Sequence, residues 1–109
     1  SVFLNLVHMV KREEGDGPII VHCSAGIGRT GTFCVVHSIV KMLNKHVAEH
    51  QEMPPINVVS TVLHMRKQRP GMVQTHDQYM FCYTAIGEEY LKLKMSLAPP
   101  SWYPYKLVK

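Results

Sequence analysis

Residues 22–31 read HCSAGIGRTG and hold a cysteine, Cys23, and an arginine, Arg29, separated by five residues. An apolar run at 18–21 precedes this stretch, and a helix-like apolar run at 33–43 follows it. This order predicts a loop between a strand and a helix. Such a loop turns its backbone N–H groups inward, and the next helix presents the positive end of its dipole. The sequence therefore predicts an anion-binding loop with a thiol at its edge.

The residue types in this loop suit chemistry at phosphorus. Inward N–H groups and a nearby guanidinium lower the pKa of a thiol, so we expect Cys23 to be ionised. The planar fork of Arg29 matches two phosphate oxygens, and the hydroxyl of Ser24 or Thr30 could donate to the thiolate. These features predict attack of sulfur on phosphorus and a cysteinyl-phosphate that water later hydrolyses. Arg29 and the loop amides would stabilise the transition state.

Two motifs resemble one family. HCSAGIGRTG looks like the active-site loop of the cysteine-dependent protein tyrosine phosphatases, His-Cys-x5-Arg-Ser/Thr. Residues 66–79, RKQRPGMVQTHDQY, are similar to the family's glutamine-bearing loop, which favours the tyrosine-specific branch. The resemblance runs from about Phe3 to about Leu93. It implies that Cys23, Arg29, Thr30 and Gln74 are catalytic, with Gln74 orienting water. The residues that it implies for substrate binding are Cys23, Ser24, Ala25, Gly26, Ile27, Gly28, Arg29, Gln74 and Gln78.

One element of the family's pattern is missing from this sequence. The family's general acid is the aspartate of a Trp-Pro-Asp loop, which the chain lacks, and its single tryptophan is Trp102. Asp16 has turn composition, and Asp77 suits the first turn of a helix, so neither is expected to be the acid. We therefore expect residues 1–97 to be the C-terminal part of a phosphatase catalytic domain and residues 98–109 to be a tail.

Three functional interpretations follow. The first is an enzyme, a protein tyrosine phosphatase that hydrolyses phosphotyrosine in protein substrates and needs no metal or organic cofactor. The second is a binding module that retains affinity for phosphate or phosphotyrosine without turnover, because the acid loop is absent. The third is a chain that does not fold alone. Binding without phosphate release would distinguish the second interpretation from the first.

Composition narrows the class of protein. The chain has 109 residues, enough for one domain, and 46% of them are hydrophobic, which is typical of globular proteins. The net charge is +4, but no basic run exceeds two residues, so we expect an anionic substrate rather than nucleic acid. No apolar run is long enough to predict a membrane span. Three cysteines favour a reducing compartment. We expect a cytoplasmic monomer, or the cytoplasmic portion of a receptor-type chain.

The hydrophobic pattern predicts an α/β fold, with one buried strand leading into the phosphate-binding loop and a helical bundle after it. Helical spacing indicates a first helix over residues 2–14 and a second from about residue 28 to about residue 46. Asn57 could cap a third helix, and Thr75 with Gln78 forms a capping-box pattern for a fourth. The strand is expected at residues 19–22. The apolar stripe expected to be buried on the last helix is Tyr79, Cys82, Tyr83, Ile86, Tyr90 and Leu93.

Several other residues allow more than one structural or functional interpretation. The glycines at 26, 28 and 31 also match a dinucleotide fingerprint, but no second strand with an acid follows. Cys34 and Cys82 fall on apolar helix faces and are expected in the core. His46 and His50 have the i, i+4 spacing of metal ligands on a helix, but the sequence pattern offers no third ligand, so we expect both at the surface. Arg66 and Arg69 could either form a solvated helix end or brace the active-site loop.

Overall fold

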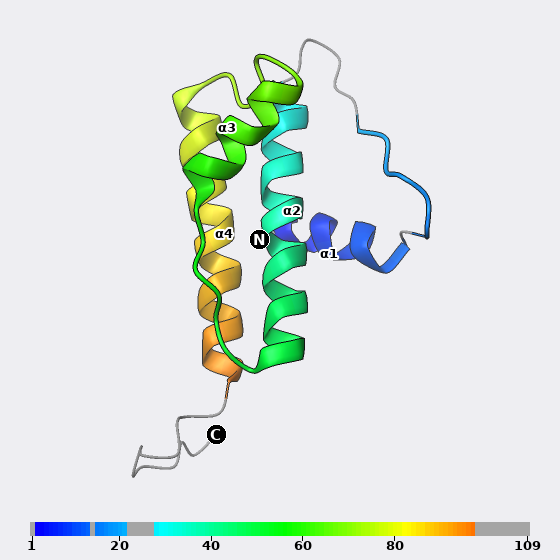
Figure 1. Ribbon diagram of the computed structural model, residues 1–109, viewed down its shortest axis with the longest axis vertical. Helices are drawn as coiled ribbons and strands as arrows, with labels where there is room; N and C mark the ends of the chain where they lie inside the picture. The colour runs from blue at the N-terminus through cyan, green and yellow to red at the C-terminus, as the bar shows by residue number, and fades with distance from the viewer. Residues whose placement is uncertain (1, 14, 22–27, 98–109) are drawn as a thin grey trace.

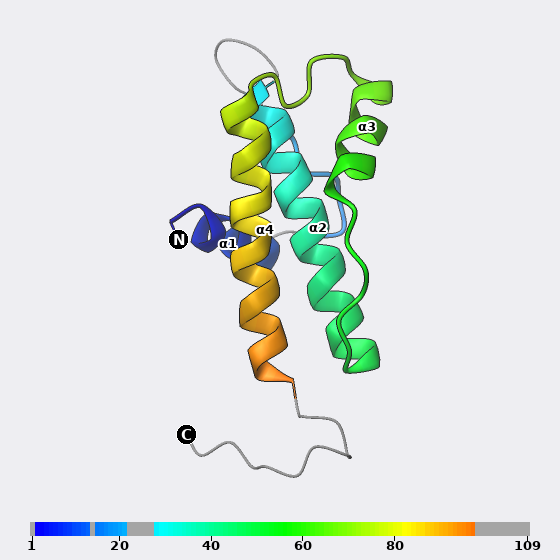
Figure 2. The ribbon, with the colours of Figure 1, turned by 90° about the vertical axis from the view of Figure 1, so that its left-hand side faces the viewer.

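A computed structural model describes residues 2–13, 15–21 and 28–97 of the chain. The described residues form four helices, α1 (Val2–Glu13), α2 (Gly28–His50), α3 (Val58–Gln68) and α4 (His76–Ser96). The two long helices, α2 and α4, lie side by side and begin at the same end of the molecule (Figure 1, Figure 2). α3 packs on α2 near that end, and α1 crosses near the middle of the α2–α4 pair.

The core lies where the four helices meet. α2 supplies the largest share of it, through buried residues that recur at helical spacing along one stripe. α4 adds Cys82, Ala85 and Ile86, and α1 and α3 each add two aliphatic residues. The buried cluster is Leu4, Val7, Val35, Val36, Ile39, Val40, Leu43, Val58, Val62, Val73, Cys82, Ala85 and Ile86.

The starts of α3 and α4 confirm the capping predictions. The side chain of Asn57 accepts a hydrogen bond from the backbone N–H of Ser60 at 2.8 Å. Thr75 Oγ1 accepts from the backbone N–H of Gln78 at 3.1 Å, and Gln78 Oε1 accepts from the backbone N–H of Thr75 at 3.2 Å. These bonds satisfy N–H groups that would otherwise have no partner in the first helical turn. They also fix where each helix begins.

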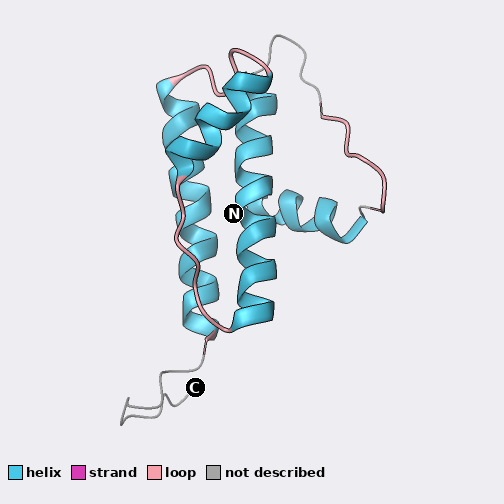
Figure 3. Ribbon diagram, in the orientation of Figure 1, coloured by secondary structure: helices cyan, strands magenta, loops and turns pink. Residues whose placement is uncertain are grey.

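The prediction of an α/β fold is wrong: the part of the chain that the structure describes is all-α (Figure 3). Residues 19–21, expected to begin a buried strand, form no strand, and Ile20 is 87% exposed. A strand forms only where a neighbouring segment pairs with its backbone groups, and the described residues provide no such neighbour. An apolar run alone therefore did not specify a strand. His22, the last residue of the predicted strand, lies outside the described residues.

Smaller differences concern where helices end and which side chains they bury. α2 continues to His50, four residues beyond the expected end at His46. It stops at Gln51, which adopts a left-handed φ of 56° and donates its backbone N–H to the carbonyl of Val47. Glycine usually takes this position, so the sequence offered no clear stop signal. On α4, Tyr83 is exposed, whereas Cys82 and Ile86 are buried as expected. The predicted tail, residues 98–109, lies outside the described residues.

Candidate functional site

The first turn of α2 contacts the two glutamines of the second motif. A Cβ atom added at Gly28 would lie 2.6 Å from Gln78 Oε1 and 3.0 Å from Gln74 Oε1. Such distances are too short for a real side chain, so only glycine leaves room for both glutamines at this point. The fold thus brings together Gly28, the first described residue of the first motif, and Gln74 and Gln78 of the second.

The side chain of Gln78 organises the approach to α4. Its Oε1 accepts hydrogen bonds from the backbone N–H groups of Gln74, at 2.8 Å, and Thr75. The carbonyl end of Gln78 is therefore engaged with the backbone, whereas its amide nitrogen is a donor beside Gly28. Gln74 is exposed at the start of this turn. Its position suits a side chain that contacts a ligand or a water molecule.

Arg66 of α3 fastens the loop that carries Gln74. Its Nε donates to the carbonyl of Met72 at 3.0 Å, and its Nη2 donates to the carbonyl of Val73 at 2.5 Å. Val73 has a φ of 63°, which is unfavourable for a β-branched residue, and its side chain is buried. The guanidinium and the burial of Val73 hold this strained residue in place, so Arg66 braces the glutamine loop. Arg69 instead forms the C-cap of α3.

A second glycine of α2 touches the same loop. A Cβ atom added at Gly31 would lie 2.5 Å from the backbone nitrogen of Val73 and 2.7 Å from the Cα atom of Met72. Gly28 and Gly31, which have two residues between them, therefore form a flat face on the first turn of α2 against the loop of residues 72–74. The positive ends of the α2 and α4 dipoles lie at this same end of the molecule (Figure 1).

The structure separates the other predicted site residues into two groups. Cys23, Ser24, Ala25, Gly26 and Ile27 lie outside the described residues. Arg29 is exposed and Thr30 is buried, and both line a hollow of about 370 Å³ that the glutamines do not reach. The other residues lining this hollow are Leu6, Val10, Ile19, Ile20, Val21 and Phe33.

The two described cysteines are suited to packing rather than to nucleophilic attack. Cys82 is 0% exposed, and burial raises its pKa to about 11. Cys34 is half-buried, and burial also raises its pKa. A thiol with a raised pKa is a poor nucleophile near neutral pH. The prediction that Cys82 belongs to the core is confirmed, whereas the same prediction for Cys34 is wrong, because this side chain is only half-buried and lies outside the buried cluster.

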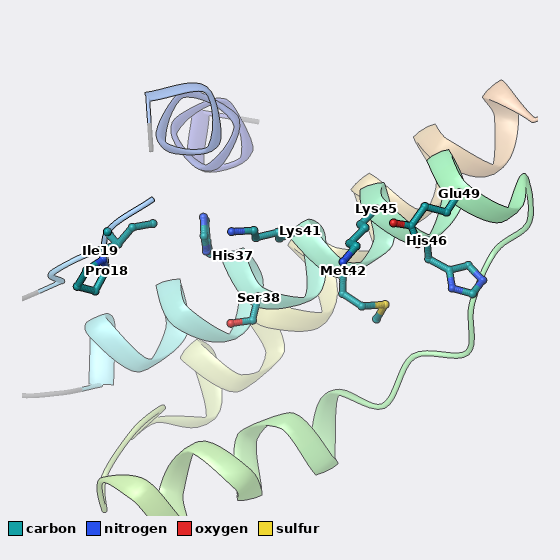
Figure 4. A pocket seen from close by; sticks show the side chains of 10 residues that line it. Pro18, Ile19, His37, Ser38, Lys41, Met42, Lys45, His46 and Glu49 are labelled. Atoms are coloured by element: carbon teal, nitrogen blue, oxygen red, sulfur yellow. The ribbon is translucent and has the colours of Figure 1, made fainter. Parts of the chain in front are cut away.

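Two features of the structure were not anticipated from sequence. One is a hollow of about 630 Å³ beside α2, where Pro18 and Ile19 face the turn that holds His37 and Ser38 (Figure 4). The other is the buried carboxylate of Glu89, which accepts hydrogen bonds from His8 and Asn44. Glu89 sits three residues after Ile86 on the buried stripe of α4, and that spacing was the available signal.

Within residues 2–13, 15–21 and 28–97, no three His, Cys, Asp or Glu residues gather in a way that could hold a metal ion. The rings of His46 and His50 are tilted by 53° with their centroids 4.4 Å apart. Carboxylates lie near both rings, Glu52 at 3.8 Å from His46 and Glu49 at 4.0 Å from His50. No helix in the same part of the chain is long and apolar enough to cross a membrane.

Known proteins with similar sequences identify the family to which the two motifs correspond. Residues 1–88 match the sequence model of a family described as protein-tyrosine phosphatase. The chain is 57% identical over 86 residues to Tyrosine-protein phosphatase 2 of Dictyostelium discoideum, an alignment that covers 79% of this chain and 23% of the relative. It is 53% identical over 73 residues to Protein-tyrosine-phosphatase PTP1 of Arabidopsis thaliana, covering 67% of this chain and 20% of the relative.

Receptor-type proteins also match. The chain is 43% identical over 87 residues to Receptor-type tyrosine-protein phosphatase S of Gallus gallus, covering 79% of this chain and 5% of the relative. The chain therefore spans less than a quarter of the length of these relatives. The matched region includes both motifs and the helices that bring their described residues together.

Proposed function

Because the chain belongs to the protein-tyrosine phosphatase family, we propose that it carries the phosphate-binding and hydrolytic residues of a phosphotyrosine phosphatase. The observation that supports this most directly is the contact of Gly28 with Gln74 and Gln78. It places a residue of the first motif against the second, although 45 residues separate Gly28 from Gln74. A nucleophilic step and a hydrolytic step at one phosphorus atom require such closeness.

In the first step of this proposal, the thiolate of Cys23 attacks the phosphorus of phosphotyrosine. The S–P bond forms, the bond from phosphorus to the tyrosine oxygen breaks, and that oxygen leaves with the electron pair and takes up a proton. Arg29 and the backbone N–H groups at the start of α2 would stabilise the charge on the phosphoryl oxygens. Thr30 is the candidate hydroxyl that assists the thiolate.

In the second step, Gln74 orients a water molecule toward the phosphorus of the cysteinyl-phosphate. The water oxygen bonds to phosphorus, the S–P bond breaks, and the thiolate returns as inorganic phosphate leaves. The brace of Arg66 on the carbonyls of Met72 and Val73 supports this role, since it fixes the residue that precedes Gln74. The substrates of such an enzyme are phosphotyrosine-containing proteins.

The test is a comparison of two cysteine variants with an aryl phosphate as substrate. Cys23→Ser should abolish phosphate release and the acid-stable phosphocysteine adduct seen after a rapid quench, because an alkoxide is not available at neutral pH. Cys34→Ser is the matched control and should keep both, since Cys34 lies outside the described site. Full activity in Cys23→Ser would refute the mechanism.

A second candidate function is phosphotyrosine binding without turnover. These 109 residues contain no Trp-Pro-Asp sequence, and loss of a general acid costs about 10²- to 10⁴-fold in rate, so a polypeptide limited to them would bind phosphotyrosine with little turnover. Calorimetry with a phosphotyrosine peptide, followed by a phosphate assay on the same sample, separates the two candidates. Binding with no released phosphate supports the binding function, whereas release that depends on Cys23 supports the enzyme.

A further inference from the structure

A basic hollow lies between α1 and α4, away from the proposed active site. Its volume is about 410 Å³, and its lining residues are Asn5, His8 and Arg12 of α1 and Lys92 of α4. The three α1 residues are spaced three and four apart, so they share one face of that helix. All four side chains carry nitrogen donors, and no acidic residue lines the hollow.

A buried carboxylate holds one wall of this hollow in place. Glu89 is 1% exposed, its Oε2 lies 3.0 Å from His8 Nε2, and its Oε1 accepts from Asn44 Nδ2 at 3.2 Å. An ionised carboxylate can only accept, so Nε2 of His8 must carry the hydrogen of this bond. This bond fixes the orientation of the His8 ring in the wall of the hollow.

The charges around the hollow favour an anion. Arg12 and Lys92 are basic residues that line the hollow, and both carboxyl oxygens of Glu89 are engaged by His8 and Asn44. Glu13 and Glu88 are neighbours in sequence, but neither lines the hollow. The guanidinium fork of Arg12, the ammonium of Lys92 and the side-chain amide of Asn5 together offer donors to several oxygens of one tetrahedral anion.

We propose that the α1–α4 hollow is a second phosphate-binding site. Lys92 lies 14 residues beyond Gln78 on the same helix, or about 21 Å along its axis, so one phosphate cannot occupy both places. Figure 2 shows α1 crossing near the middle of α4, well below the end where α2 and α4 begin. The ligand is a phosphate dianion, either free or carried as a monoester on a protein side chain.

The test is an NMR titration of the 109-residue chain with inorganic phosphate and, separately, with a phosphoserine peptide. The Asn5 side-chain amide and the His8 ring should shift in a saturable way. Arg12→Gln and Lys92→Gln should each weaken this binding by about tenfold, since each removes a charge-assisted contact. Lys94→Gln removes the same charge outside the hollow and should leave the affinity unchanged.

Two further measurements distinguish binding at the hollow from binding at the active site and identify the source of the phosphate. Arg29→Met should abolish shifts at Gln74 and Gln78 but keep those at Asn5 and His8. Tighter binding of the peptide than of the free ion identifies a phosphorylated chain as the ligand, and equal binding identifies the ion; both support the site. Absence of saturable shifts at Asn5 and His8, or equal weakening in Lys94→Gln, would overturn the proposal.

Discussion

Gly31 of α2 lies directly against Val73 of the glutamine loop, so closely that an added Cβ atom would be 2.5 Å from the Val73 backbone nitrogen. The residue at position 31 therefore sets the distance between the first turn of α2 and the loop that carries Gln74. Val73 cannot withdraw easily, because Arg66 binds its carbonyl and its side chain is 2% exposed.

Gly31→Ala is expected to destabilise the protein by about 1–3 kcal/mol, because backbone atoms of the loop must move to admit the methyl group. Gly87→Ala is a matched change in the interior of α4, where an added Cβ meets no atom within 4 Å. It should instead stabilise the protein by about 0.5–1 kcal/mol, since alanine favours the helix. Urea denaturation of both variants measures the sign of each change in the free energy of unfolding. Equal effects of the two changes would contradict the close contact at Gly31.

Glu89→Ala should lower the free energy of unfolding by about 3 kcal/mol or more, because it removes the acceptor of His8 and Asn44 and leaves a cavity at a buried position. The double variant Glu89→Ala with Asn44→Ala should cost less than the sum of the two single changes, since both remove the same bond. Denaturation of the four proteins in this cycle gives the coupling. Strict additivity would show that the Asn44–Glu89 bond contributes nothing to stability.

Arg66→Met should lower the free energy of unfolding by about 1–3 kcal/mol, because two carbonyl groups lose their guanidinium donors. The methionine keeps most of the apolar part of the arginine side chain. Hydrogen exchange at the amide of Gln74 should become faster in this variant, as the loop loses its brace. Lys67→Met, the next residue on α3 and an exposed one, is expected to stay within about 0.5 kcal/mol of the parent. Unchanged exchange at Gln74 in Arg66→Met would argue against the brace.

Cys82 makes stability depend on pH in the alkaline range. Burial raises its folded-state pKa to about 11, above the value of an unfolded thiol. As pH rises above the unfolded value, the unfolded chain loses this proton first, so the free energy of unfolding falls until pH reaches about 11. Cys82→Ala should flatten this part of the stability curve relative to the parent. Parallel curves for the two proteins would show that the thiol does not contribute.

Local sequence signals predicted the helices and their starts well. Asn57, and the pair Thr75 and Gln78, indicate helix N-termini because their side chains form hydrogen bonds with nearby backbone N–H groups. Donor and acceptor lie within three residues of each other, so a short stretch of sequence is enough to predict the bond. The end of α2 was missed because Gln51 takes the left-handed conformation without being glycine. The expected strand at residues 19–22 failed for a different reason: its existence depends on a partner segment, which local composition cannot supply.

The contacts among the described residues of the candidate site could not be predicted from the sequence. The glycine spacing matched a dinucleotide fingerprint, but it gave no sign that Gly28 and Gly31 lie against the glutamine loop. The role of Arg66 was left open from sequence, because its partners are backbone carbonyls, which no side-chain pattern reveals. Cys23 and its neighbours up to Ile27 stay predictions, since they lie outside the described residues.

The bond between His8 and Glu89 has a kinetic consequence, because it joins residues 81 positions apart and so closes a loop through most of the molecule. Bringing such distant residues together costs chain entropy that short-range contacts within α2 and α3 do not demand. We therefore expect α1 to dock after the folding transition state. Loss of the His8–Glu89 bond should mainly accelerate unfolding and leave the refolding rate nearly unchanged.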